Sequence, residues 1–566
     1  MIKLMNFSID HFRSIEHVEI TMPKDKPLVL FGPNNSGKSN IISAVHRALG
    51  ERWPQSIEML DSDFFMRDSE QYPEVSIRCR FNETYCSNRN KTQEYDHFAL
   101  RYNANVERNR FTVDDESWPS ISQKIRSNIQ SILIDAERNI DYQLSYTSRY
   151  TLLSKFSHAI HKALSSQERE TLKESYEQIK GVFESDEKFS AFFDSFRNSV
   201  KESVKGFVHH LEIDFSAYDP NNYANIMRIV AKEGNQTRTF NEFGTGEQQI
   251  LLMAFAKAYM ETFGASSIIL ILEEPEAHLH PLAQRWLKEY IYDVCKSMQV
   301  IVSTHCADFI DPSNLEGLVR VSKDDRNITR TIQLTPQQLT QHCIEAGVPE
   351  SVTNEKGIAE FYAARLFPDA LKGLFAEKVL LVEGPTEYLS LPIFFSKANF
   401  SLPSNGIEII SCGGKNNIPY YYRLFTAYGI ECACLFDADE SDGKTNDELE
   451  RLLNIVVSSD EPTEFVVDSH CAYFAKDYET TTRAQIENYS DLEALAKNEY
   501  KAGKSKPTIA RIIASLSQSV PSYIDQVVKL LCSTEEDAYE EDFMGYDLWE
   551  DYSSEPYYPY DDEIPF

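Results

Sequence analysis

The sequence predicts an α/β protein in which two successive domains are each built on a mainly parallel sheet. Residues 28–49 read as an apolar strand, a glycine-rich loop and a helix with one apolar face. Beyond residue 377, three more short apolar runs end in acidic or glycine-rich turns, and helical patterns follow them. The length agrees, because 566 residues are enough for two to four domains.

Charge and cysteine content narrow the functional classes. The chain has 56 Lys and Arg against 88 Asp and Glu, and this net charge of −32 argues against a generally basic nucleic-acid-binding protein. The ten cysteines are scattered without a C-x-x-C pair, so neither a zinc ribbon nor a disulfide framework is indicated. No signal peptide is evident, and the longest apolar run, 268–272, is too short to span a bilayer. We therefore expect a cytoplasmic protein without membrane contact.

The strongest motif is the loop 32–39, GPNNSGKS, which fits the pattern G-x-x-x-x-G-K-[ST]. Such a loop directs backbone N–H groups and the positive end of the following helix toward a phosphate chain. Lys38 would reach the β- and γ-phosphates, and the Ser39 hydroxyl would hold Mg²⁺. The residues expected to bind the nucleotide here are Asn34, Asn35, Ser36, Gly37, Lys38, Ser39 and Asn40.

Later segments suit the same nucleotide. Gly244 and Gly246 open an apolar helix, where a helix cap explains the glycines as well as a phosphate contact does. The buried strand 267–272 delivers Glu273 and Glu274 at its carboxyl end, where Mg²⁺ and an attacking water are held beside a phosphate loop.

A further buried strand, 299–302, leads to His305. A single histidine is more often structural, but this one follows the third strand that ends toward one ligand. Residues 150–208 have helical periodicity, and an ordinary helical subdomain and a protruding self-association element explain them about equally well.

Carboxylates gather at the strand ends of the second domain. Glu383 ends one strand and Glu387 lies in the first turn of the next helix, while Asp437 and Asp439 end another strand. Sites in open parallel sheets lie at this edge, and clustered acids without matching bases need hard cations, so we expect Mg²⁺ or Mn²⁺. Acidic loops that simply face water would explain one such strand end, but explain two poorly.

The first domain resembles a known family. The segments HFRSI, FGPNNSGKSN, FGTGEQQ, ILEEPEAHLHP and STHCAD together resemble an ABC-type ATPase of the SMC-like branch, over roughly residues 1–340. The resemblance implies two chains that sandwich two ATP molecules, with Glu273 supporting Mg²⁺, Glu274 polarising the attacking water and His305 sensing the γ-phosphate. The signature reads G-T-G-E-Q instead of L-S-G-G-Q, and Glu273 replaces the usual Asp, so we expect slow turnover.

The second domain, with E-G-x-x-E at 383–387 and D-x-D at 437–439, resembles a Toprim domain. An SMC-like ATPase followed by Toprim resembles the OLD family (overcoming lysogenization defect) of nucleases, which includes the Gabija anti-phage nuclease subunit. The resemblance implies that Asp477 and Glu479 assist the metal site. It also implies that Lys506, rather than Lys504, neutralises the scissile phosphate.

Together with the resemblance to the OLD family, these patterns imply a metal-dependent DNA endonuclease or nickase that is regulated by ATP, and the resemblance implies a role in anti-phage defence. A homodimer or higher homo-oligomer and a helicase or other defence partner are expected. The alternatives are an ATP-driven DNA clamp with a non-catalytic Toprim domain, and a topoisomerase- or primase-like enzyme. The expected divisions are ATPase (1–149), helical insertion (150–208), ATPase (209–340), connector (341–376), Toprim (377–532) and an acidic aromatic tail (533–566), most simply disordered.

Overall fold

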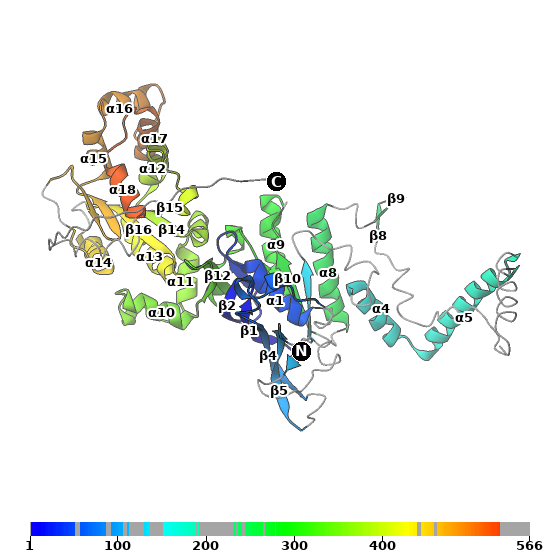
Figure 1. Cartoon of the computed structure of the whole chain (residues 1–566). Coiled ribbons are helices and arrows are strands. Elements are labelled where there is room, and N and C mark those ends of the chain that lie inside the picture. The colour runs from blue at the N-terminus through cyan, green and yellow to red at the C-terminus, as the bar shows by residue number, and fades with distance from the viewer. Residues whose placement is uncertain are drawn as a thin grey trace, which may run out of the picture. The chain divides into compact units, whose positions relative to one another are not determined.

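The computed structural model divides the chain into two compact units. The first comprises Met1–Glu377 and Tyr420–Glu431, and the second Lys378–Pro419 and Cys432–Phe566 (Figure 1). The structure describes residues 2–50, 57–86, 92–105, 110–112, 129–134, 151–187, 190–191, 230–233, 236–239, 244–263, 267–277, 279–438, 443–457 and 461–532. The predicted acidic tail lies outside these residues.

The first unit is built around two sheets. The six-stranded sheet has the order β13-β12-β3-β11-β10-β7, and all its neighbouring strands are parallel except the β12–β13 pair. Its strands are β3 (Leu28–Phe31), β7 (Ile129–Ile134), β10 (Ser267–Glu273), β11 (Gln299–Ser303), β12 (Leu318–Lys323) and β13 (Thr329–Gln333).

The second sheet of this unit is antiparallel, in the order β2-β1-β4-β5-β6. It contains β1 (Leu4–Phe12), β2 (Ile15–Thr21), β4 (Glu74–Cys86), β5 (Glu94–Asn103) and β6 (Arg110–Thr112). Two further strands, β8 (Val230–Glu233) and β9 (Gln236–Thr239), form a separate antiparallel ribbon.

Helices cover both faces of the six-stranded sheet because alternate residues of its strands point to opposite sides. Ile269 and Ile271 of β10 join the core shared with α1 (Lys38–Leu49) and the antiparallel sheet. Leu270 of β10 joins the other core, with α8 (Thr245–Phe263) and α9 (Pro281–Val294). The near-continuous apolar strand in the sequence therefore corresponds to a strand buried on both faces.

The described part of the predicted helical insertion contains α4 (Leu152–Ala163) and α5 (Ser166–Glu184). Phe156 of α4 packs against Phe255 of α8, with ring centroids 5.4 Å apart. The rest of 150–208 lies largely outside the described residues. Toward the end of the unit follow α10 (Pro336–Glu345) and α11 (Ile358–Arg365).

The second unit has one sheet in the order β15-β14-β16-β18-β17. Its strands are β14 (Lys378–Val382), β15 (Ile407–Ser411), β16 (Glu431–Asp437), β17 (Phe465–Asp468) and β18 (Cys471–Phe474). The pairs β14–β15 and β16–β18 are parallel, whereas β17–β18 is antiparallel. The three strands expected from the sequence are thus present.

The helices of this part are α12 (Pro385–Lys397), α13 (Ile418–Ala427), α14 (Gly443–Leu453), α15 (Tyr478–Gln485), α16 (Tyr489–Asn498), α17 (Lys506–Leu516) and α18 (Tyr523–Cys532). The core of the second unit joins β14 and β16 to α12, α17 and α18. Most of α13 groups with the first unit, although the chain passes through it between β15 and β16. Among the described helices, none combines the length and apolar character needed to cross a membrane.

Candidate functional site

The phosphate loop encloses its own lysine. β3 ends at Phe31, and α1 begins at Lys38, which is 5% exposed. Its Nζ donates to the carbonyl oxygens of Gly32 and Pro33 at 3.0 and 2.8 Å, and to the Ser36 hydroxyl at 3.3 Å. The loop therefore holds a cation at the positive end of a helix, an arrangement suited to phosphate oxygens.

Two glycines are required by close approach and backbone conformation. Gly32 has φ 140°, and a Cβ added there would lie 2.0 Å from the carbonyl oxygen of Val321. Gly37 has φ 109°, and its added Cβ would lie 2.2 Å from Thr329 Oγ1. No other residue fits without moving β12 or β13.

Some residues of the loop and of the first turn of α1 are exposed to solvent. Asn34, Asn35 and Ser39 are exposed, and Asn35 has φ 60°. Asn40 Nδ2 donates to Ser14 Oγ at 2.8 Å, so the predicted nucleotide-binding Asn40 also ties α1 to the turn between β1 and β2.

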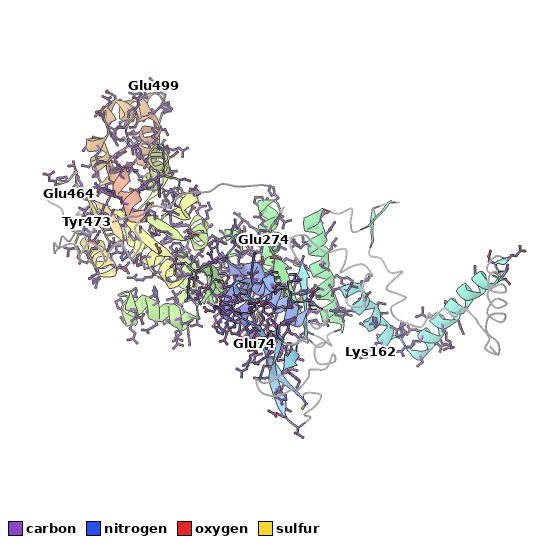
Figure 2. The ribbon with its side chains drawn as sticks, in the orientation of Figure 1. Glu74, Lys162, Glu274, Glu464, Tyr473 and Glu499 are labelled. Atoms are coloured by element: carbon purple, nitrogen blue, oxygen red, sulfur yellow. The ribbon has the colours of Figure 1, made fainter. Side chains whose placement is uncertain are left out.

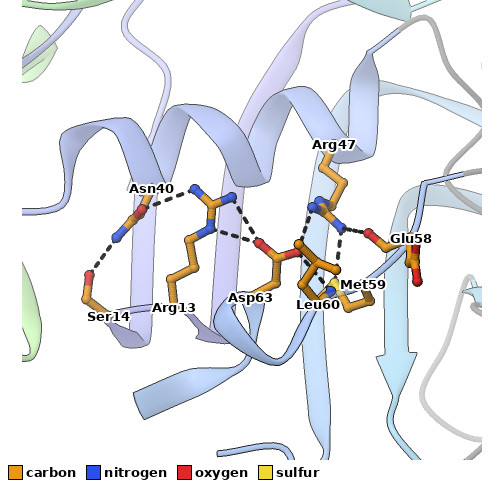
Figure 3. Close-up of polar contacts among 8 residues, drawn as sticks. All are labelled: Arg13, Ser14, Asn40, Arg47, Glu58, Met59, Leu60 and Asp63. Carbon is orange, nitrogen blue, oxygen red and sulfur yellow. Dashed lines mark hydrogen bonds and ion pairs between the residues drawn. The ribbon is translucent and has the colours of Figure 1, made fainter. Parts of the chain in front are cut away.

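A buried carboxylate holds α1, the helix that follows the phosphate loop (Figure 3). Asp63, 3% exposed, accepts from Arg13 Nε at 3.0 Å and from Arg47 of α1 at 3.0 Å. Arg13 also donates to Asn40 Oδ1 at 3.3 Å. One buried acid paired with two arginines therefore fixes α1 against the antiparallel sheet. The sequence interpretation missed Asp63, because it lies 50 residues from Arg13 and belongs to no local motif.

The acidic residues at the end of β10 differ in position and contacts. Glu273 ends the strand and is partly buried, and Glu274 follows with φ 45°, its N–H donating to the Ser303 carbonyl at 3.0 Å. The Glu274 carboxylate, labelled in Figure 2, lies 3.4 Å from His305 Nε2. The structure thus brings together Glu274 and His305, which were both predicted from strand ends.

Glu276 is a further residue of this site, which sequence reasoning missed although it belongs to the same acidic run. It is 8% exposed, and its Oε1 accepts from Thr304 Oγ1 at 2.6 Å and from the N–H of His305 at 2.9 Å. It therefore holds the end of β11, and so the backbone of His305, in one position.

The charges of this site act on one another. Burial lowers the pKa of Lys38 to about 8, although Glu274 and Glu276 act in the opposite direction. Burial and the charge of Lys38 lower the pKa of His305, against the effect of Glu274. Burial raises the pKa of Glu276 despite its hydrogen bonds. A buried cation is therefore flanked by carboxylates, which suits a phosphate chain that arrives with Mg²⁺.

The opening of α8 forms the helix cap that the sequence left as an alternative. Glu247 Oε2 accepts from the N–H of Gly244 at 3.2 Å. Gly246 approaches Leu279, whose Cδ2 would lie 2.2 Å from an added Cβ. The approach of Leu279 gives a local reason for Gly246, whereas the hydrogen bond at Gly244 does not require a glycine. The predicted phosphate contact of both glycines stays a prediction.

Carboxylates also meet at one edge of the second unit's sheet. Glu383 follows β14, and its Oε2 accepts from the N–H of Asp437 at 3.3 Å. Asp437 ends β16, and its Oδ1 accepts from the N–H of Tyr478 at 3.0 Å. Glu387 lies in the first turn of α12, 5% exposed, and its Oε2 accepts from the N–H of Gly384 at 3.1 Å.

Burial and mutual repulsion dominate the electrostatics there. Burial, with the charges of Glu387, Glu383 and Glu479, raises the pKa of Asp437 to about 9. Burial, with the charges of Glu383 and Glu479, raises the pKa of Glu387 to about 7. Each carboxylate thus opposes the ionisation of its neighbours, and a divalent cation with oxygen ligands would relieve this repulsion.

We call Glu383, Glu387, Asp437 and Glu479 the carboxylate cluster. Two lysines contact its residues. Lys506, at the start of α17, has Nζ 3.2 Å from Glu479 Oε1. Partial burial opposes its charge, but the carboxylates of Glu479, Asp477 and Asp437 raise its pKa overall. Lys415, 5% exposed, donates to the carbonyl oxygen of Asp437 at 2.8 Å. Lys415 was not predicted, although its place after the glycine turn of β15 was visible.

Of the remaining metal ligands predicted in the second unit, Asp439 lies outside the described residues. Asp477 is the N-cap of α15, and its Oδ1 accepts from the N–H of Thr480 at 2.6 Å. Within the described ranges, no three His, Cys, Asp or Glu side chains are arranged to hold a metal ion. The donor chemistry fits a hard cation, and the full ligand set stays a prediction.

Comparisons with known proteins identify both domain types. The model of the Overcoming lysogenization defect protein-like TOPRIM domain matches residues 374–439, and the AAA ATPase domain model matches residues 76–310. The chain is 25% identical to the OLD nuclease of Thermus scotoductus (strain ATCC 700910 / SA-01) over 460 residues, 77% of this chain and 82% of the relative. It is 21% identical to Endonuclease GajA of Bacillus cereus (strain VD045), across 73% of this chain and 71% of that protein.

Among solved structures, the chain is similar to the Smc head domain of Pyrococcus furiosus with an extended coiled coil, bound to the C-terminal domain of ScpA. The two share 17% identity over 61% of this chain and 99% of the other, with a TM-score of 0.38. The predicted combination of an ATPase domain with a Toprim domain is confirmed.

Proposed function

We propose that this chain, which joins an AAA-type ATPase domain to an OLD-like Toprim domain and resembles OLD nucleases, is a metal-dependent DNA endonuclease or nickase regulated by ATP. The observation that carries the proposal is the carboxylate cluster at a strand-end edge, with Lys506 beside it. We also propose a role in anti-phage defence, which the resemblance of the sequence motifs to the OLD family implies, and a location in the cytoplasm.

The proposal gives each site residue of the second unit a role. Glu383 and Asp437, with Asp439 and Glu387, would hold Mg²⁺ or Mn²⁺, which would supply an acidified water and neutralise developing charge. Lys506 would bind the scissile phosphate, and Glu479 orients it through their 3.2 Å ion pair. The Tyr478 N–H fixes Asp437 by donating to it, so this carboxylate keeps one orientation while the phosphodiester bond breaks.

The first unit would control this activity. Lys38 would bind the ATP phosphates, and Ser39 with Glu273 would hold Mg²⁺. Glu274 would orient the attacking water, and His305, paired with Glu274, would contact the γ-phosphate. Because hydrolysis of DNA needs no energy from ATP, the nucleotide regulates cleavage and does not drive it. Two chains would sandwich two nucleotides in a homodimer or higher oligomer, with a helicase as a candidate partner.

The test is cleavage of supercoiled plasmid by the full chain with Mg²⁺ or Mn²⁺. Nicked or linear DNA is expected, and EDTA should stop its formation. Glu383→Ala and Lys506→Ala should lose at least about a hundredfold in rate, since the first removes a proposed metal ligand and the second the cation proposed to bind the scissile phosphate. Lys504→Ala should be milder, and Asp525→Asn, a change of an exposed acid on α18, is the matched control.

Two results would contradict the proposal. One is full activity of Glu383→Ala with either metal. The other is DNA that the wild-type chain retains in an ATP-dependent manner but never cuts, which would favour the DNA clamp.

A further inference from the structure

The segment between α16 and α17 carries an unusual set of exposed side chains. Residues 500–506, here called the lysine loop, read YKAGKSK. Tyr500 is 54% exposed, which is high for an aromatic residue, and Lys501 and Lys504 are exposed as well. Figure 2 labels Glu499, which immediately precedes the loop at the end of α16.

The backbone of the lysine loop is held firmly. Lys501 and Gly503 have φ of 55° and 63°, so the chain turns twice within three residues. Between them Ala502 is 9% exposed, and its N–H donates to the carbonyl oxygen of Ala496 at 3.0 Å. The N–H of Ser505 donates to the Ala502 carbonyl at 3.2 Å. A buried anchor therefore presents the outward side chains from a fixed backbone, which reduces the entropy lost on binding.

The loop ends at the carboxylate cluster. Lys506, its last residue, pairs with Glu479, and Lys504 lies two residues earlier. Ser505 is the N-cap of α17 and makes no side-chain capping bond, so the positive end of this helix adds to the lysine charges. Any strand whose phosphate reached Lys506 would have its neighbouring phosphates close to this loop.

Within the lysine loop, Lys506 is paired with Glu479, but the charges of Lys501 and Lys504 are not neutralised in the same way. Among the described residues, neither Lys501 nor Lys504 takes part in a salt bridge. On neighbouring α16, Glu493 is already paired with Arg483 at 3.1 Å and with Lys497 at 2.8 Å. In a chain with a net charge of −32, two such lysines beside an exposed tyrosine point to an anionic partner with flat, apolar faces.

We infer that the lysine loop binds the DNA strand next to the cleaved phosphate, with a preference for unpaired nucleotides. Lys501 and Lys504 contact backbone phosphates, and the Tyr500 ring stacks on an exposed base. Within a fully paired duplex the bases are stacked on each other, so Tyr500 gains its contact only at a gap, a flap or a locally melted site. The inference rests on the proposed nuclease function and adds the class of DNA that the site selects.

The test measures binding of the full chain to fluorescein-labelled DNA by anisotropy, in EDTA so that no strand is cut. One DNA carries a short single-stranded gap, and the other is the same duplex without the gap. The double variant Lys501→Gln, Lys504→Gln should weaken binding to both DNAs about tenfold or more. In a plot of the logarithm of the binding constant against the logarithm of the salt concentration, its slope should be shallower by about 0.7 to 0.9 for each lysine removed. Lys529→Gln, an exposed lysine on α18, is the matched control and should match the wild type.

Variants at Tyr500 and Glu499 distinguish the contribution of base stacking to DNA binding from the contribution of charge. Tyr500→Ala should weaken binding to gapped DNA about tenfold while changing duplex binding little, and Tyr500→Phe should restore the preference. Glu499→Gln removes a neighbouring negative charge and should tighten binding to both DNAs.

The outcomes distinguish the inference from the proposed function. If the wild type cuts plasmid but the double lysine variant binds with unchanged affinity and salt slope, the lysine loop inference is wrong. Equal losses for gapped and paired DNA in Tyr500→Ala would refute the preference for unpaired nucleotides. If the wild type binds through the loop but never cuts with any metal, the nuclease proposal fails and the binding surface stands.

Discussion

Replacing Asp437 by Asn should abolish cleavage and, without metal, stabilise the second unit. The amide keeps the shape of the side chain and can still accept the Tyr478 N–H at 3.0 Å. It removes a carboxyl group whose pKa burial and neighbouring carboxylates raise from 3.8 to about 9. Because the folded state binds this proton more tightly than the unfolded chain does, the stabilisation is complete below about pH 4 and is lost as the pH rises toward 9. Asn does not titrate, so its advantage grows over the same interval.

The size of the gain follows from the same linkage. At pH 8 the medium lies about 4 units above the ordinary pKa, and at about 1.4 kcal/mol per unit the upper bound is about 6 kcal/mol. Glu387, with its pKa raised to about 7, shares protons with Asp437, so the substitution relieves only part of the repulsion. We expect about 2–3 kcal/mol at pH 8 and less than about 1 kcal/mol at pH 5, which corresponds to a rise in Tm of about 5–10 °C at pH 8.

The assay is thermal unfolding of both chains at pH 5 and pH 8, in EDTA and in Mn²⁺. Mn²⁺ should stabilise the wild type at pH 8 through binding to the ionised carboxylates, and should stabilise Asp437→Asn much less. Plasmid cleavage by the variant should be lost. Equal stability of the two proteins at both pH values, or equal stabilisation by Mn²⁺, would refute the view that these carboxylates repel one another until a cation binds.

Four other predictions concern the first unit. Lys38→Ala should lose ATP binding but keep metal-dependent cleavage, and failure of a folded variant to cut DNA with or without nucleotide would contradict separate roles. Because the pKa of Lys38 is about 8, its positive charge is lost above that pH, so ATP affinity measured by calorimetry should fall between pH 7 and pH 9, by up to about tenfold per unit above pH 8. Arg320, 5% exposed, donates to the carbonyl oxygens of Tyr428, Gly429 and Ala376, so Arg320→Met should cost about 3–5 kcal/mol in urea unfolding, and the half-exposed Arg330→Met should cost little. Light scattering at micromolar concentration should show at least a homodimer, and a monomer with and without ATP would contradict the shared nucleotide sites.

The sequence predicted those parts of the sites that are local in the chain. The phosphate loop is specified by eight consecutive residues, and its two glycines are needed for contacts that the structure places at β12 and β13. Glu383 and Asp437 could be predicted because buried parallel strands are recognisable as apolar runs, and their carboxyl ends must meet at one edge. Although Glu383 and Asp437 are far apart in the sequence, they could be predicted together, because each was assigned to the end of its own strand and not paired with a distant residue.

What the sequence could not predict depends on tertiary packing. Asp63 supports α1 through arginines 50 and 16 residues away, and no motif joins these positions. Glu276 was visible as an acid, but its role comes from the end of β11, 28 residues later in the chain. A buried ion pair or carboxylate is recognised by its burial and its partners, and both arise only when separate elements pack.

The net charge of the chain and a DNA substrate are compatible because charge acts locally in salt water. Thirteen acids without Lys or Arg lie in 534–566, so of the net −32 about −19 remains on the rest of the chain. At physiological ionic strength, exposed charges more than about 8 Å away are largely screened, whereas a lysine in contact with a phosphate is not. DNA affinity should therefore depend on the few cations next to the proposed cleavage site, Lys501, Lys504 and Lys506, and not on the total charge.

Neutralisation of the carboxylate cluster by a divalent cation should also favour DNA binding, because it removes the strongest nearby repulsion when the phosphate approaches. The metal that the chemistry needs would thus also strengthen the binding of DNA by an acidic protein.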